Sequence, residues 1–278
     1  MVYKKLELKN YFEFLGENGA NPTLELFLPY NMSEMGRENQ KRPCILVCPG
    51  GGYGMCSQRE AEPIALNFLN EGFNAFVLTY SCAPHRFPTQ IREVAAAMEL
   101  IYENAEGWNC DTEKIAIIGF SAGGHLAAHY STMFDCKEVR EVFPNSKSVN
   151  ASILSYPVIT ADKAHYHGGS FMNLLGHDIE TPEEENYFSC ERNVDKNTPP
   201  AFIWHTASDN CVPVKNSMLY AEALMNNNIP VELHIYPFGC HGLSTCDRET
   251  NSDISTEIAY DSQWLPEVKN WLKLIFKL

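Results

Sequence analysis

The stretch KIAIIGFSAGGHLAAHYSTMF occupies residues 114–134. It begins with an apolar run, Lys114–Gly119, whose β-branched side chains are typical of a buried strand. From Ala122 onward it continues with small residues that predict a helix. A strand that passes directly into a helix must reverse sharply, and the glycines two positions before and after Ser121 leave room for that reversal. The stretch therefore predicts a strand–turn–helix unit with Ser121 at its tip.

Segments of the same two kinds alternate along the rest of the chain. Short apolar or alternating runs predict strands, and longer runs with apolar residues three or four apart predict helices. The predicted strands are Thr23–Leu28, Cys44–Cys48, Asn74–Tyr80, Ala151–Ser155, Ala201–Thr206 and Val231–Tyr236. The predicted helices are Ser57–Asn70, with a Ser57/Glu60 capping box at its start, Thr89–Asn104, Val214–Asn227 and Tyr260–Phe276. This alternation predicts an α/β fold, with one mainly parallel sheet and helices on both faces.

One segment, residues 159–200, breaks the alternation. It is polar, carries the acidic run Glu183–Glu185 and ends in a Thr-Pro-Pro sequence. We expect it to be a short, lid-like insertion over the sheet. The whole chain, residues 1–278, is expected to form a single domain. Loops at the carboxyl ends of parallel strands are where such folds place their chemistry.

The composition excludes several classes of function. The chain has 21 Lys and Arg residues against 35 Asp and Glu residues, a net charge of −14. An acidic surface repels phosphate backbones and anionic lipid, so neither nucleic acid nor a membrane is an expected partner. The amino-terminal residues lack the apolar core of a signal peptide, which favours a cytoplasmic protein. The ten cysteines form no CxxC pair, so we expect reduced thiols.

The sequence Gly119-Phe120-Ser121-Ala122-Gly123 fits the pattern G-x-S-x-G. Between a strand and a helix, this pattern presents the serine hydroxyl at the top of the sheet. The first N–H groups of the following helix then face any anion that forms there. Ser121 is therefore a candidate nucleophile. The alternative is a tight glycine turn in which the serine merely caps the helix.

A serine hydroxyl needs a base to take its proton, and the base needs a carboxylate to orient it. His241 is the candidate base, because it lies between glycines just past the predicted strand Val231–Tyr236. Asp209 is the candidate carboxylate, three residues past the strand Ala201–Thr206. The chain order Ser121, Asp209, His241 is the order of the α/β-hydrolase triad.

Six other histidines are predicted to be structural or solvated. His125 and His129 lie four apart on one helix, a spacing that can hold a metal, but HLAAH lacks the glutamate of a zinc HExxH motif. Four more lie in the polar insertion or inside predicted strands: His165, His167, His205 and His234. We therefore predict neither a metal nor an organic cofactor.

The glycine run after the strand Cys44–Cys48 is the candidate oxyanion hole. Acyl transfer places negative charge on a carbonyl oxygen, which requires preorganised N–H donors. We expect those donors to be the N–H groups of Gly51, Gly52 and Ala122. A phosphate-binding loop is the alternative, but the run lacks both GK[ST] and GxGxxG. A small apolar acyl pocket is expected nearby, with walls from Tyr53, Phe120, Tyr156 and Val212.

At these motifs the chain resembles α/β-hydrolase esterases of the acetyl-esterase and hormone-sensitive-lipase-like type. It is most similar to the bifunctional acetylxylan/feruloyl esterases. The resemblance covers residues 43–278 and is carried by PGGGY at 49–53, FSAGGHLA at 120–127, TPPAFIWHTASDNCVPVKNS at 198–217 and YPFGCHGLS at 236–244. One departure is Pro49, which stands where the lipase-like families have the histidine of His-Gly-Gly-Gly.

The resemblance implies a serine carboxylesterase in which Ser121 is the nucleophile, Asp209 the acid and His241 the base. It also implies short acyl esters as substrates, acetyl or feruloyl groups on plant-derived sugars or oligosaccharides. A homo-oligomer is left open. Two alternatives remain at this point: a peptidase or amidase of the same fold, aryl-formamidase-like or prolyl-peptidase-like, and a non-catalytic binding module on a hydrolase scaffold.

Overall fold

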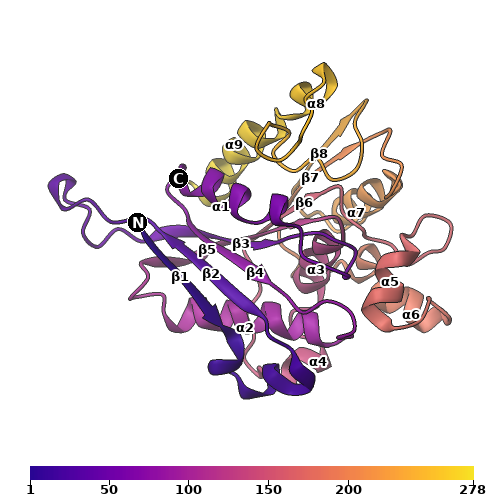
Figure 1. The fold of residues 1–278 in the computed structure, drawn as a ribbon, viewed down its shortest axis with the longest axis horizontal. Coiled ribbons are helices and arrows are strands. Elements are labelled where there is room, and N and C mark those ends of the chain that lie inside the picture. Colours follow the sequence, from indigo (N-terminus) through magenta and orange to yellow (C-terminus); the bar gives the residue numbers. More distant parts are fainter.

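The computed structural model describes residues 1–278, apart from the side chain of Asn18. Its centre is an eight-stranded sheet flanked by helices (Figure 1). The strands are β1 (Val2–Glu7), β2 (Thr23–Leu28), β3 (Arg42–Cys48), β4 (Asn74–Thr79), β5 (Cys110–Phe120), β6 (Ala151–Ser155), β7 (Ala201–Thr206) and β8 (Val231–Tyr236). The α-helices are α1 (Glu62–Leu69), α2 (Thr89–Glu103), α3 (Ser121–Met133), α4 (Lys137–Arg140), α5 (Gly168–Leu175), α6 (Pro182–Phe188), α7 (Lys215–Asn226), α8 (Thr256–Asp261) and α9 (Trp264–Phe276). Short 3₁₀ helices are η1 (Leu8–Asn10), η2 (Glu13–Gly19), η3 (Ser33–Met35), η4 (Gln58–Glu60) and η5 (Cys190–Asn193).

The strands lie in the order β1-β2-β4-β3-β5-β6-β7-β8. All neighbours from β4 to β8 are parallel, whereas β1 and β2 are antiparallel to their neighbours. The fold is thus the α/β-hydrolase fold, with the mainly parallel sheet that the sequence predicts. β3 and β5 are adjacent, and Cys48 pairs with Gly119 at their ends. The glycine run after β3 and the turn at Ser121 therefore leave the sheet side by side.

Two apolar cores cover the two faces of the sheet. Successive residues of β3 alternate between them, with Leu46 in one and Val47 in the other. The first core includes residues of α2, α3 and α7, and the second includes residues of α1 and α9. Figure 1 shows α1 and α9 on one side of the sheet and α2 on the other. Buried apolar side chains on both faces fix the strand ends that carry the loops of the site.

Four details differ from the sequence prediction. β1 was not expected, because most of its side chains are exposed and only its backbone pairs with β2. The predicted closing helix is divided into α8 and α9. The insertion contains α5, α6 and η5, and α6 begins with a capping box at Thr181. The predicted capping box at Ser57 is absent: Ser57 makes no cap, and Glu60 turns inward to other partners.

Within the described residues, no helix has the length and apolar character needed to cross a bilayer.

Candidate active site

Ser121 lies at the tip of the turn between β5 and α3. Its backbone is in the left-handed region (φ 53°), and its exposed fraction is 7%. A Cβ atom on Gly119 would lie 2.1 Å from the carbonyl oxygen of Gly123, and one on Gly123 would lie 2.2 Å from that of Cys48. Only glycine fits at both positions, and this close packing holds Ser121 in a conformation that L-residues rarely adopt.

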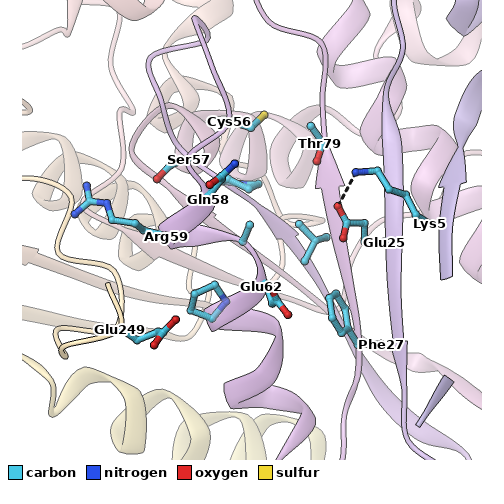
Figure 2. A pocket seen from close by; sticks show the side chains of 14 residues that line it. Lys5, Glu25, Phe27, Cys56, Ser57, Gln58, Arg59, Glu62, Thr79 and Glu249 are labelled. Carbon is cyan, nitrogen blue, oxygen red and sulfur yellow. Dashed lines mark hydrogen bonds and ion pairs between the residues drawn. The ribbon is translucent and has the colours of Figure 1, made fainter. Parts of the chain in front are cut away.

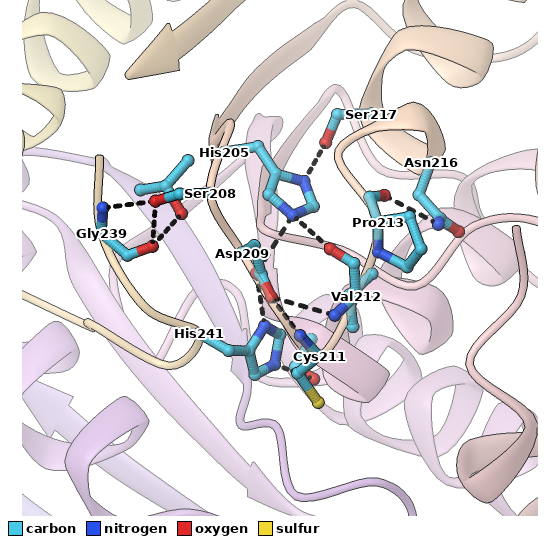
Figure 3. A network of polar contacts seen from close by, with 12 residues as sticks. His205, Ser208, Asp209, Cys211, Val212, Pro213, Asn216, Ser217, Gly239 and His241 are labelled. Carbon is cyan, nitrogen blue, oxygen red and sulfur yellow. Dashed lines mark hydrogen bonds and ion pairs between the residues drawn. The ribbon is translucent and has the colours of Figure 1, made fainter. Parts of the chain in front are cut away.

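His241 lies between Ser121 and Asp209, the other two predicted residues of the site, and Figure 3 shows its ring beside Asp209. Its Nε2 is 2.8 Å from Oγ of Ser121, and its Nδ1 is 2.7 Å from Oδ2 of Asp209. Because the carboxylate can only accept, Nδ1 carries the hydrogen and Nε2 presents its lone pair to the serine hydroxyl. Three loops distant in sequence thus bring together the groups that nucleophilic catalysis needs.

The carboxylate of Asp209 accepts four hydrogen bonds. Oδ2 accepts from His241 and from Nε2 of His205, which lies 3.2 Å away. Oδ1 accepts the backbone N–H groups of Cys211 (2.8 Å) and Val212 (3.0 Å). Burial favours the neutral acid, but the hydrogen bonds from His205 and His241 outweigh it and hold the pKa of Asp209 well below its ordinary value. The group that orients His241 is therefore an anion.

His205 is a residue of the site that the sequence did not identify. We expected it to be a packing residue of a strand, yet its buried ring contacts Asp209 (Figure 3). Its Nε2–H is shared between Asp209 and the carbonyl oxygen of Val212, 3.0 Å away. Nδ1 accepts from the hydroxyl of Ser217 at 2.8 Å, which fixes this tautomer. Its place at the end of β7, four residues before Asp209, is the signal that could have revealed it.

The loop after β3 carries free N–H groups beside Ser121. Gly51 (φ 125°) and Gly52 (φ 63°) both have backbone conformations that favour glycine. Among the hydrogen bonds of the described residues, neither N–H group has a protein acceptor, whereas the N–H of Gly50 donates to Glu60. Ala122 is in the first turn of α3, where N–H groups have no partner within the helix. The expected donors are thus available for an anion.

The insertion is connected to this loop. Nδ2 of Asn173, in α5, donates to the carbonyl oxygen of Gly52 at 2.9 Å. The hydroxyl of Tyr53 lies 2.8 Å from Nδ1 of His125, whose Nε2 lies 2.9 Å from the carbonyl oxygen of Phe188 in α6. Burial lowers the pKa of His125 to about 4, so its ring is a neutral connector at pH 7. His125 therefore packs inside the fold, as predicted. It joins α3 to the glycine loop through Tyr53 and to the insertion through Phe188.

The four residues expected to line an acyl pocket are buried. Tyr53, Phe120, Tyr156 and Val212 have exposed fractions of 0–1%. A side chain without accessible surface cannot touch a substrate in this conformation. Phe120 packs against Tyr156 and Trp264, and the ring of Tyr156 meets that of His241 edge-on at 5.0 Å. The expected pocket wall is corrected accordingly: these residues support the site from behind.

His167 lies closer to the site than the sequence suggested. We expected a solvated loop residue, but its Nδ1 is 2.9 Å from Oγ of Ser170, and its Nε2 is 3.6 Å from Sγ of Cys211, near Asp209. Burial and the nearby charge of His241 lower its pKa, against the opposing effect of Asp209. The insertion thus places a mainly neutral imidazole at the edge of the site.

A separate cavity of about 680 Å³ lies between residues 56–63, which follow the glycine loop, and the strands β1, β2 and β4 (Figure 2). Ser57, Gln58 and Arg59 line one wall, and the ion pair of Lys5 and Glu25 lies on the opposite wall. Its lining residues do not include Ser121 or His241. In the described part of the chain, no three His, Cys, Asp or Glu side chains cluster as metal ligands would.

Comparison with protein families places this geometry in context. Residues 27–224 match the family model described as BD-FAE. The chain is 40% identical over 233 residues to endo-1,4-beta-xylanase B of Butyrivibrio fibrisolvens. The aligned residues make up 80% of this chain and 36% of that protein. It is 35% identical over 243 residues to an acetylxylan esterase of Xylanibacter ruminicola. Here the aligned residues make up 86% of this chain and 47% of that protein. The chain thus spans less than half the length of these two relatives.

Solved structures share the whole fold. The acetyl ester-xyloside bifunctional hydrolase from Caldicellulosiruptor lactoaceticus superposes with a TM-score of 0.84 at 31% identity, over 98% of this chain and 96% of that one. The hydrolase MGS-M1, from a deep-sea metagenome, superposes with a TM-score of 0.79 at 32% identity, over 100% of this chain and 99% of that one. The similarity therefore extends beyond the segment matched by the family model.

Proposed function

Because the chain belongs to the BD-FAE family of α/β-hydrolases, we propose that it is a serine carboxylesterase that removes short acyl groups, acetyl above all, from sugar hydroxyls. The observation that carries the proposal is the placement of His241, within hydrogen-bond distance of both Ser121 and Asp209. The N–H groups of Gly51 and Gly52, which have no protein acceptor among the described residues and follow the Gly50 that packs against Ser121, support the same chemistry.

In the proposed reaction, His241 Nε2 takes the hydroxyl proton of Ser121 as Oγ attacks the ester carbonyl carbon. The carbonyl oxygen becomes an anion and accepts hydrogen bonds from the N–H groups of Gly51, Gly52 and Ala122. The anion of Asp209 stabilises the imidazolium that forms and holds its ring in place. Collapse of the intermediate then breaks the bond to the alcohol, which leaves with the proton from Nε2.

The second half of the reaction regenerates the serine. A water molecule gives its proton to His241 Nε2 and attacks the acyl carbon through the same oxyanion. Collapse releases the carboxylic acid and returns the proton to Ser121 Oγ. The site needs no change in arrangement between the two halves, because the same three side chains and donors serve both.

Xylan-derived sugars are the proposed alcohol half of the substrate. One relative is an acetylxylan esterase, and one structural neighbour is an acetyl ester-xyloside hydrolase. A neutral sugar is also compatible with a net charge of −14, whereas an anionic substrate would meet repulsion.

The test compares p-nitrophenyl esters of increasing acyl length with acetylated xylo-oligosaccharides. We expect turnover to be highest for acetate and acetate to be released from the oligosaccharides. A fluorophosphonate probe should label the wild-type protein stoichiometrically but not a Ser121→Ala variant. Faster cleavage of matched anilides than of esters would instead indicate an amidase or peptidase, and absence of both labelling and turnover would refute the proposal.

A further inference from the structure

A buried carboxylate, Glu60, lies between the glycine loop and the loop of His241. It belongs to η4, whose other residues, Gln58 and Arg59, line the open cavity of Figure 2. Glu60 itself has an exposed fraction of 3%. A buried carboxylate is unfavourable unless its oxygens are hydrogen-bonded, so its partners must compensate for its lost hydration.

One oxygen of Glu60 holds the glycine loop. Its Oε2 accepts the N–H of Gly50 at 2.8 Å. This bond fixes the peptide between Pro49 and Gly50, and the next two N–H groups, of Gly51 and Gly52, have no protein acceptor among the described residues. A Cβ atom on Gly50 would lie 2.7 Å from Oε2 and 3.0 Å from Cβ of Ser121. The carboxylate, the loop and the nucleophile are therefore packed against one another.

The other oxygen reaches the His241 loop through Tyr156. Oε1 accepts the hydroxyl hydrogen of Tyr156 at 2.6 Å. The same hydroxyl accepts the N–H of Ser244 at 2.9 Å, and the ring of Tyr156 packs edge-on against the imidazole of His241. The hydroxyl of Ser244 donates in turn to the carbonyl oxygen of Arg59 at 2.6 Å, which ties the His241 loop back to η4.

We propose that Glu60 is a positioning residue that fixes the oxyanion donors and the general base relative to each other. This inference rests on the proposed esterase function. Burial raises the pKa of Glu60, while the hydrogen bonds from Tyr156 and Gly50 oppose that rise because both of its oxygens act as acceptors. Donors held in place before the reaction are what oxyanion stabilisation requires. Movement of the glycine loop would break its hydrogen bond to Glu60, and movement of the His241 loop would break the bond from Ser244 to Tyr156, the partner of Glu60.

The first test is Glu60→Gln, which keeps the shape of the side chain. The amide cannot accept from both Gly50 and Tyr156 with the same two atoms, so one link is lost. We expect kcat for p-nitrophenyl acetate to fall by about 10–100-fold, as for other residues that orient catalytic groups. KM should stay within about twofold, because the lost interaction acts in the transition state. Glu62→Gln, the same change at an exposed residue two positions on, is the matched control and should leave kcat unchanged.

The second test removes the same link from its other end and leaves Glu60 in place. Tyr156→Phe deletes the hydroxyl between Glu60 and Ser244, and we expect it to lower kcat as well. The double variant should lose no more activity than the worse single variant, because residues in one network are not additive. Fluorophosphonate labelling of Ser121 should slow in parallel with kcat, since it also places charge in the oxyanion hole. Tyr260→Phe, at an exposed tyrosine, is the control.

These outcomes separate the inference from the function on which it rests. Glu60→Gln with wild-type kcat and labelling rate would overturn the positioning role. Additive losses in the double variant, or a loss that appears only in KM, would overturn it as well. A wild-type protein that neither hydrolyses the ester nor takes the label would overturn the proposed esterase function itself.

Discussion

His205 Nε2 lies 3.2 Å from Oδ2 of Asp209, the same oxygen that accepts from Nδ1 of His241. The carboxylate that orients the base is thus itself held by a second, fully buried imidazole. Ser217 fixes the tautomer of that second imidazole. The orientation of His241 therefore depends on a chain of hydrogen bonds that reaches from the site into α7.

His205→Phe should lower kcat by about 10–100-fold, because Asp209 would lose one of the donors that fix its orientation. Ser217→Ala should have a smaller effect in the same direction, since the ring would remain but its tautomer would be less constrained. Steady-state kinetics with p-nitrophenyl acetate measure both. His234→Phe, in the neighbouring strand β8, is the control, and an equal loss there would mean that the effect comes from the sheet alone.

Ser121→Ala should lower kcat by about 10⁶-fold, the scale of loss when the nucleophile is removed from such a triad. The variant should remain folded, because alanine occupies no more space than serine. Ser131→Ala, in the same helix, makes the same change away from the turn and should retain turnover. If Ser121→Ala kept even a tenth of the wild-type rate, Ser121 would not be the nucleophile.

Asp209→Asn should cost about 10⁴-fold in kcat, because an amide can stabilise the wrong tautomer of His241. The side chain keeps its size, so the fold should be preserved, and circular dichroism can check this. A near-normal rate would show that another group orients the imidazole.

Ester hydrolysis should fall as the medium becomes acidic, because a protonated His241 cannot accept the proton of Ser121. The measurement is kcat/KM for p-nitrophenyl acetate between about pH 4.5 and 8. A flat profile across this range would contradict a histidine base. The buried anion Asp209 should not contribute a step there, because its hydrogen bonds hold its pKa well below the ordinary range.

Glu93, on α2, should make the folded protein less stable as the pH rises, whereas ester hydrolysis should become faster. It is buried, and burial raises its pKa to about 7 although its Oε2 accepts the N–H of Ser81 at 2.7 Å. The unfolded chain ionises this group near pH 4.5, so its contribution to stability is lost as the pH rises through 7. Glu93→Gln should therefore raise the melting temperature at pH 8 and change it little at pH 5. A lower melting temperature at pH 8 would refute this account.

The convergence of Ser121, Asp209 and His241 could be predicted because each follows a recognisable strand. Parallel strands end at one edge of the sheet, so loops far apart in sequence meet there. The sheet itself could be predicted for a similar reason: strands covered on both faces are continuous apolar runs, as in β3. An edge strand such as β1 lacks that signature, because its side chains face water.

The supporting residues could not be predicted, because their partners are distant in the chain. The spacing of Ser57 and Glu60 suits a helix cap, but the carboxylate bonds instead to Gly50 and to Tyr156, which directly follows β6. Likewise, Tyr156 and Val212 are apolar enough to suggest a pocket wall, yet packing covers them completely. Local patterns do not encode which long-range partner a buried group will find.

The bond from Asn173 to the carbonyl oxygen of Gly52 has a consequence for protein engineering. Segments above an active site are attractive regions to exchange between homologues, since they are expected to alter selectivity and leave the chemistry alone. Here α5 braces the glycine loop, so a transplanted segment without an amide donor at this place would alter rate and selectivity together. A successful graft would have to carry that asparagine with it.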